Sequence, residues 1–198
     1  MNPTPQQQRS GRRQLLLIAS IFFVPIAAAV WLYFSSGWRP SVGVQHGELV
    51  DPPRPLPALA LSQLDGSRAA ADLLRGQWFL VHVVAGHCTD RCLAVLADLR
   101  QLRLALDKDA GRVRRVLLHD GTCCDAAFPA LEPDLLVLAA EGPEGAAFLG
   151  HFPPAADGAF GIYIVDPQGN LMMSYPATGS QRGLLKDLER LLRLSSIG

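Results

Sequence analysis

The chain has no excess of charge of either sign. Its 198 residues contain 18 basic and 18 acidic side chains, so the formal net charge is zero and the pI is about 7.0. Nucleic-acid-binding proteins usually have a raised pI and a basic face, so this composition argues against that class. Lysine is almost absent: Lys108 and Lys186 are the only two, and arginine supplies the rest, which indicates a GC-rich bacterial gene.

Acidic residues are missing from residues 1–14, and charged residues of both signs are missing from residues 15–34. The first segment contains Arg9, Arg12 and Arg13, and the second is the run LLLIASIFFVPIAAAVWLYF. A helix of that length spans about 30 Å, the thickness of a hydrocarbon core. Because basic residues stay on the cytoplasmic side, we predict a cytoplasmic tail over 1–14 and a transmembrane helix over 15–34.

A cleaved signal peptide is the alternative interpretation of this segment. Ala27 and Ala29 form the small-x-small pattern that a signal peptidase requires. However, the apolar run is longer than a usual signal sequence, and Trp31, Tyr33 and Trp38 lie at its far end as an interfacial belt would. These features favour an uncleaved anchor with the rest of the chain on the outer side.

A stretch rich in proline and glycine separates this helix from the remainder. Residues 35–55 contain SSGW, RPSVG and DPPRPLP, which predict a tether. Residues 56–198 then show the alternating apolar patterns of one folded domain.

The predicted elements of this domain follow a recognisable order. The almost continuous apolar run QWFLVHVVA predicts a buried strand, and a stripe of leucines and valines spaced by three and four predicts the helix after it. A dithiol at the first strand-to-helix junction makes the order typical of a thioredoxin-like α/β domain. We expect strands at 56–61, 77–85 and the later half of 112–120, helices at 89–106, 144–152 and 180–194, and a hairpin at 161–176.

The dithiol consists of Cys88 and Cys92 in the segment GHCTDRC. In the orientation predicted above, both face an oxidising space such as a bacterial periplasm. Cys88 would lie near the helix N-terminus, which favours the thiolate, and Cys92 would lie one turn later on the same face. Such a pair can close a structural disulfide, act as a redox couple, or bind a soft metal such as Cu(I).

The segment GQWFLVHVVAGHCTDRC resembles the Sco/SenC family, membrane-anchored thioredoxin-fold copper proteins used in cytochrome c oxidase assembly. His87, Cys88, Asp90 and Cys92 match its T-H-C-P-D-x-C-P motif, and YIVDPQG is similar to its later hairpin. More narrowly, HGELVDPP and DPQGNLMMSYP resemble an uncharacterised group of thioredoxin-like membrane proteins encoded among bacterial oxidase-assembly genes. The resemblance implies copper as the cofactor of Cys88 and Cys92.

The chain departs from the Sco pattern at its third ligand. Thr89 and Leu93 replace the two prolines of the motif, and Gly158 stands where the family places a copper-binding histidine. The cis-proline of membrane-tethered thiol reductases is missing as well, since residues 160–162 are Phe-Gly-Ile.

The segment HDGTCC contains residues that could replace this ligand. If the first two buried strands run parallel, the loops at their carboxyl ends share one rim. His119, Cys123 or Cys124 would then face Cys88 and Cys92. A disulfide between the two loops and a pair of small buried cysteines are the alternatives, and a Cys123–Cys124 disulfide is the least favoured because it distorts the intervening peptide.

The remaining histidines give weaker signals. His82 has apolar neighbours within a predicted strand, which favours a residue packed in the core over a metal ligand. His46 lies in the predicted tether.

These patterns support three hypotheses about function. The first is a Sco-like accessory factor for cytochrome c oxidase assembly that binds or relays copper in the periplasm, anchored in a bacterial inner membrane. The second is a periplasmic thiol-disulfide oxidoreductase, in which Cys88 attacks and Cys92 resolves the mixed disulfide. The third is a scaffold with a permanent disulfide. The expected partners are oxidase subunits or other assembly factors, and no nucleic acid.

Overall fold

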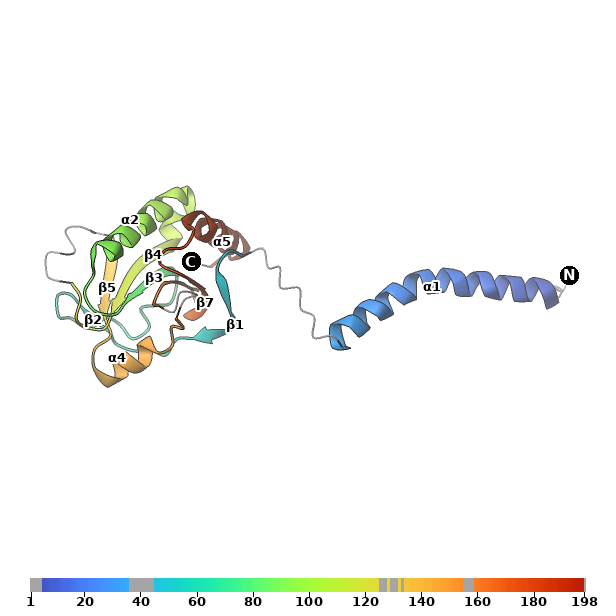
Figure 1. Cartoon of the computed structure of the whole chain (residues 1–198), viewed down its shortest axis with the longest axis horizontal. Helices are drawn as coiled ribbons and strands as arrows, with labels where there is room; N and C mark the ends of the chain where they lie inside the picture. Colours follow the sequence, from blue (N-terminus) through green and yellow to red (C-terminus); the bar gives the residue numbers. More distant parts are fainter. Residues whose placement is uncertain are drawn as a thin grey trace. The chain divides into compact units, whose positions relative to one another are not determined.

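The computed structural model describes residues 5–35, 45–124, 128, 132, 134–154 and 159–197. The chain divides into two compact units, Met1–Val44 and Gln45–Gly198. Figure 1 shows the helix of the first unit and the mixed sheet of the second. The sequence signals for an N-terminal apolar helix and a thioredoxin-like α/β domain are therefore both confirmed.

The helix of the first unit, α1, runs over Pro5–Ser35. Its segment Arg13–Phe34 is 22 residues long and, within the described part of the chain, is the one helix long and apolar enough to cross a membrane. At 1.5 Å rise per residue this segment is about 33 Å long, which matches a hydrocarbon core. Pro25 lies inside the helix, as expected for an apolar segment that tolerates it.

A seven-stranded sheet forms the centre of the second unit, in the order β1-β7-β6-β3-β4-β5-β2. β3, β4 and β5 are parallel to one another, and the remaining neighbours are antiparallel. The parallel pairing of β3 and β4 confirms the arrangement on which the shared rim depends. The strands are β1 (Glu48–Pro55), β2 (Ser62–Gln63), β3 (Trp78–Val84), β4 (Val113–His119), β5 (Leu135–Ala139), β6 (Ile162–Val165) and β7 (Asn170–Tyr175).

Helices cover both faces of the sheet (Figure 1). Alternate strand residues point to opposite faces, so Leu80 packs against α2 and α5, whereas Val81 and Val83 belong to the core beside α4. The buried stripe of α2 is the one predicted from its spacing. The helices are α2 (Asp90–Ala105), the 3-10 helix η1 (Asp107–Arg112), α4 (Gly142–Leu149) and α5 (Gln181–Leu194).

The domain begins earlier than the sequence pattern predicts. Residues 48–55, assigned to the tether above, form β1 and pair with β7 at the edge of the sheet, so that part of the prediction is wrong. An edge strand needs ladder hydrogen bonds on one side only, which is why it accommodates three prolines. Val50 is buried, and the backbone N–H of Leu56 donates to the Gly169 carbonyl at 2.9 Å. Residues 36–44 of the tether lie outside the described residues.

Two further details differ from the predicted elements. Residues 56–61 form no strand, although Leu56 and Leu61 are buried in the core beside α4. β5 lies in the stretch 121–143, where no strand was predicted. A five-residue apolar run carries no periodicity that separates a strand from a short helix, and only its pairing with β4 makes it one.

Candidate functional site

The first cysteine pair lies where β3 gives way to α2. Gly86 has a left-handed φ of +82°, a conformation that residues with a Cβ rarely adopt, and it turns the chain toward the helix. Thr89 is the N-cap of α2. Cys88, just before it, is partly exposed, and Cys92 is buried on the first turn.

Cys88 and Cys92 are joined as a disulfide with their Cα atoms 5.2 Å apart. The two residues are close together, as predicted, because Cys88 immediately precedes the N-cap of α2 and Cys92 lies on its first turn. Copper binds cysteine as the thiolate, so a disulfide offers it no ligand, and reduction of this bond would free two soft ligands side by side. The residues therefore fit Cu(I) in their reduced state.

The second pair lies in the loop after β4. Cys123 and Cys124 form a disulfide between consecutive residues, with Cα atoms 3.7 Å apart. This corrects the expectation that such a bond is the least favoured arrangement. The expectation assumed that the bond would distort the peptide between the two cysteines. The irregular loop accommodates this, and Cys124 has a φ of +68°.

Asp120 connects the two cysteine loops. Its Oδ2 accepts a hydrogen bond from the Gly86 backbone N–H at 3.0 Å. This bond joins the loop after β4 to the loop after β3. Its Oδ1 accepts from the Thr122 backbone N–H at 3.1 Å and from the Thr122 hydroxyl at 2.7 Å. The hydrogen bond from the Thr122 side chain is the main reason that the pKa of Asp120 lies below its ordinary value.

Asp120 was not among the site residues predicted from the sequence. The available signal was its place in HDGT, because an aspartate before glycine commonly accepts hydrogen bonds from the backbone two residues later. Its bond to Gly86 is a tertiary contact that no local pattern indicates.

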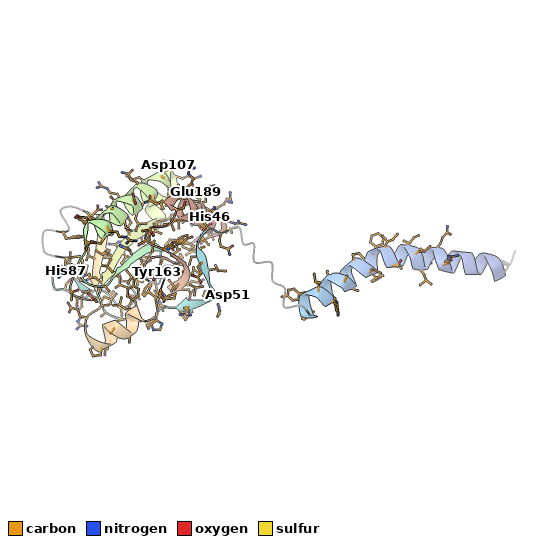
Figure 2. The ribbon with its side chains drawn as sticks, in the orientation of Figure 1. His46, Asp51, His87, Asp107, Tyr163 and Glu189 are labelled. Atoms are coloured by element: carbon orange, nitrogen blue, oxygen red, sulfur yellow. A yellow bond between two sulfur atoms is a disulfide. The ribbon has the colours of Figure 1, made fainter. Side chains whose placement is uncertain are left out.

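The two disulfides share one pocket of about 620 Å³, called the disulfide pocket below. All four cysteines also belong to, or pack against, one apolar cluster that includes Leu96 and Leu117. The rim predicted from the parallel strands therefore brings Cys88 together with Cys123 and Cys124. His87 is exposed at the edge of the domain (Figure 2). The pocket is lined by His87, Cys88, Leu93, residues 121–124 and Phe128.

His119, the other predicted ligand, is the last residue of β4 and is buried. Its Nδ1 accepts a hydrogen bond from the Gly121 backbone N–H at 3.1 Å, and its Nε2 makes no hydrogen bond with the described residues. Burial lowers the pKa of His119, which favours the neutral ring that metals require.

The disulfide-bonded structure does not gather these groups into a metal site. His119 is not among the residues that line the disulfide pocket. Within the described residues, no three or more histidine, cysteine or acidic side chains converge as metal ligands. Gly158, where the Sco motif has its histidine, lies outside the described residues.

His82 lies on β3 and lines a pocket together with Cys92. It is buried, as predicted, and its Nδ1 lies 3.1 Å from the Gly161 carbonyl oxygen, to which it donates. Burial lowers the pKa of His82. It also lines a second pocket, of about 830 Å³, together with Thr89, Arg91 and Cys92. The alternation of an apolar strand predicts burial, but it does not indicate this neighbouring pocket.

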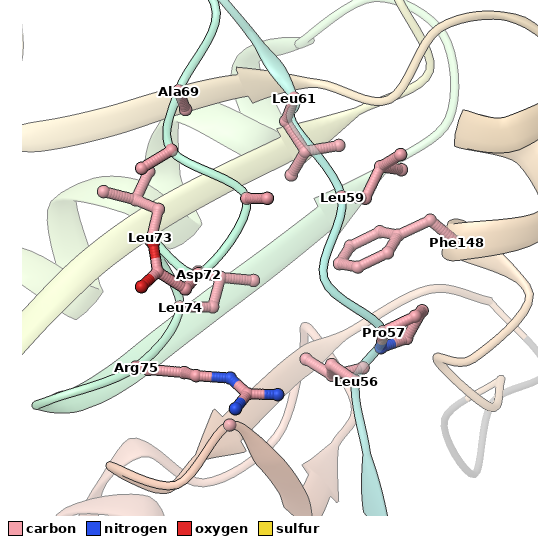
Figure 3. A pocket seen from close by; sticks show the side chains of 13 residues that line it. Leu56, Pro57, Leu59, Leu61, Ala69, Asp72, Leu73, Leu74, Arg75 and Phe148 are labelled. Atoms are coloured by element: carbon pink, nitrogen blue, oxygen red, sulfur yellow. The ribbon is translucent and has the colours of Figure 1, made fainter.

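A third pocket, on the α4 side of the sheet, is a packing defect of the core. Figure 3 shows Leu56, Leu59 and Phe148 on one side of it and Leu73 and Leu74 on the other. Its volume is about 20 Å³, enough for about one water molecule. None of its lining residues is a cysteine or a histidine, so it does not belong to the candidate site.

Solved structures of Sco proteins have the same fold. Copper-bound Sco1 from yeast is 15% identical, with a TM-score of 0.57 over 70% of this chain and 95% of that chain. Copper-bound ScoI from Arabidopsis thaliana is 18% identical, with a TM-score of 0.54 over 72% and 98%. BsSco, described as having a disulfide switch and as a member of the Sco family of cytochrome c oxidase assembly proteins, is 16% identical, with a TM-score of 0.56 over 75% and 99%. At these identities the likeness confirms the predicted Sco-like resemblance at the level of the fold.

A comparison with curated proteins gave no match. Two family descriptions do match the chain itself. Residues 5–36 match the transmembrane-like N-terminal domain, and residues 78–195 match the transmembrane-like, thioredoxin-like C-terminal domain. The second match covers more than half of the chain, and the protein therefore belongs to this family of transmembrane-like, thioredoxin-like proteins.

Proposed function

We propose that this protein is a membrane-anchored accessory factor for cytochrome c oxidase assembly, which binds or relays Cu(I) through reduced Cys88 and Cys92. The observation that carries the proposal is the position of this pair at the β3-to-α2 junction of a Sco-like fold. A reduced pair at this place presents two soft thiolates, one of them accessible from solvent.

The proposed location is a bacterial inner membrane with the C-terminal domain in the periplasm. Arg9, Arg12 and Arg13 precede the apolar segment of α1, and basic residues favour the cytoplasmic side. Two disulfides in the C-terminal unit are consistent with an oxidising compartment. Oxidase subunits or other assembly factors are the proposed partners.

Cys123, Cys124 and His119, the further copper ligands predicted from the sequence, differ in how well they are placed. Cys123 and Cys124 line the same pocket as Cys88, whereas His119 does not. We therefore place the two cysteines before the histidine as further ligands once their disulfide is reduced. Two thiolates alone also suffice for a linear Cu(I) site.

A thiol-disulfide oxidoreductase is the second candidate, and one observation favours it. Cys88 is partly exposed while Cys92 is buried, the arrangement expected of an attacking and a resolving cysteine. The third hypothesis, a scaffold with a permanent disulfide, requires instead that the Cys88–Cys92 bond resist reduction.

A Cu(I) titration of the reduced full-length protein against a competing chelator tests the proposal. We expect one tightly bound Cu(I) per chain in the wild type and at least a hundredfold loss of affinity in Cys88→Ser/Cys92→Ser. The matched control, Cys123→Ser/Cys124→Ser, should keep the one-to-one stoichiometry with a smaller loss. Weak binding that the first double substitution leaves unchanged would refute the copper role, and the reduction potential of the pair would then separate the oxidoreductase from the scaffold.

A further inference from the structure

The disulfide between Cys123 and Cys124 does little for stability. A disulfide stabilises a fold mainly by closing a loop in the unfolded chain, and the effect grows with the length of that loop. A bond between consecutive residues closes no loop beyond its own peptide. The two residues nevertheless pack beside the other disulfide of the domain. The position of this bond beside the other disulfide therefore indicates a role in thiol chemistry rather than in stabilising the fold.

Each disulfide has one cysteine that is partly exposed, and these two cysteines line the same pocket. Cys88 and Cys124 are both partly exposed and both line the disulfide pocket. Their partners, Cys92 and Cys123, are each 6% exposed. Thiol-disulfide exchange requires that a thiolate reach a sulfur of the other bond, so the accessible residues are the pair placed to react.

The loops that carry these cysteines are held together independently of them. The Asp120 carboxylate accepts a hydrogen bond from Gly86 at 3.0 Å on one loop and bonds from Thr122 on the other. This contact keeps the two loops adjacent when either disulfide opens. Among the described residues that line the pocket none is acidic, so none of them disfavours a thiolate there.

We propose that Cys123 and Cys124 form a second redox centre, which exchanges disulfide bonds with Cys88 and Cys92 and thereby controls whether the copper-binding thiols are free. The inference rests on the proposed role of Cys88 and Cys92. The reducing equivalents come from an external dithiol, which becomes oxidised to its own disulfide as it reduces Cys123 and Cys124.

The exchange has two balanced steps. The Cys124 thiolate attacks Sγ of Cys88, a Cys88–Cys124 bond forms, and Cys92 leaves as a thiolate. The Cys123 thiolate then attacks Sγ of Cys124, the Cys123–Cys124 bond forms again, and Cys88 leaves as a thiolate. Two electrons pass from one pair to the other, and the two thiol protons exchange with solvent.

The test traps the mixed disulfide in the full-length chain. Cys92→Ser/Cys123→Ser retains Cys88 and Cys124, the two partly exposed cysteines of the pocket lining. After mild oxidation with oxidised dithiothreitol, free thiols are blocked with a maleimide and the intact mass is measured. We expect most chains to lose both thiols through an intramolecular bond. The matched control, Cys88→Ser/Cys123→Ser, retains buried Cys92 with Cys124 and should form its bond at least tenfold more slowly.

Two results would overturn the relay. One is that Cys88 and Cys124 stay free under conditions that fully oxidise Cys88 and Cys92 in Cys123→Ser/Cys124→Ser. The other is that both trapping variants oxidise at the same rate. Either result leaves the Cu(I) titration of the Cys88–Cys92 pair unaffected. If copper binding fails but the mixed disulfide forms normally, the copper role is removed and the exchange is kept.

Discussion

Single residues decide how the two cysteine loops meet, and Asp120 supplies a hydrogen bond from one loop to the other. It joins Gly86 at the end of β3 to Thr122 after β4 through one carboxylate. Without the Asp120 carboxylate, the Gly86 N–H and the Thr122 N–H and hydroxyl would donate to water instead. The geometry of the disulfide pocket therefore depends on an acidic residue that ligates nothing itself.

Asp120→Asn should lower the free energy of unfolding at pH 7 by about 1 kcal/mol, because a charged acceptor is replaced by a neutral one at a solvent-screened site. The hydrogen bonds that lower the pKa of Asp120 stabilise its charged form. This stabilisation is fully present above the ordinary value of 3.8 and is lost as the pH falls through the lower folded-state pKa. Denaturant unfolding should therefore show the two proteins converging in acid.

The control for this measurement is Asp98→Asn, a change of an exposed carboxylate on α2. It should alter stability by less than about 0.5 kcal/mol at any pH. An Asp120 variant that behaves like the Asp98 variant would contradict the role assigned to the loop contact.

At the scale of elements, the edge strand β1 depends on a helix at the far end of the chain. Asp187 of α5 is buried and accepts hydrogen bonds from the backbone N–H groups of His46, at 2.6 Å, and Gly47, at 3.1 Å. The Tyr175 hydroxyl of β7 donates to the same carboxylate at 2.9 Å. These bonds attach the segment before β1 to α5 and β7.

Asp187→Ala should destabilise the domain by about 3 kcal/mol, since it leaves buried donors without their charged acceptor. Burial alone raises the pKa of Asp187, but the hydrogen bonds from His46 and Tyr175 outweigh it and lower that pKa. The contribution is therefore present above pH 3.8 and lost as the pH falls through the lower folded-state value. Hydrogen exchange should show early loss of protection in residues 48–50.

Glu189→Ala provides the comparison, because Glu189 lies exposed on the same helix (Figure 2). It should leave the protection of β1 unchanged. Equal loss of protection in both variants would mean that β1 responds to any change in α5 rather than to the Asp187 contact.

At the scale of the whole molecule, the chain consists of an apolar helix and a separate domain that begins at Gln45. The boundary matters because β1 covers the edge of β7. An uncovered strand edge offers its backbone groups to other chains and promotes association.

Two truncations test this boundary. Residues 45–198 should fold as a monomer, whereas residues 56–198 should melt at least about 5 °C lower and self-associate, because they lack Val50 and the β1 pairing. Calorimetry and size-exclusion chromatography measure both effects. Equal melting temperatures and equal sizes would place the domain boundary at residue 56, where the sequence pattern had put it.

Local patterns in the sequence determined much of this protein. The uncharged run predicts α1, the spacing of apolar residues predicts α2 and α5, and GHCTDRC places Cys88 and Cys92 one turn apart. Each of these features depends on residues within about one to five helical turns of each other, so periodicity and capping suffice. Ser180, for example, caps α5 as predicted by accepting from the Gly183 N–H at 3.3 Å.

Tertiary structure decided the features that depend on distant partners. Proline-rich residues 48–55 became a strand only because β7 pairs with them. Arg115 is fully buried because Glu132, at 2.8 Å, Asp134 and the Leu96 carbonyl accept its hydrogen bonds. The sequence shows that HDGTCC follows a buried strand. The Asp120–Gly86 bond and the pocket lined by Cys88, Cys123 and Cys124 arise instead from the parallel pairing of β3 and β4, because only that pairing brings the ends of two separate strands to one place.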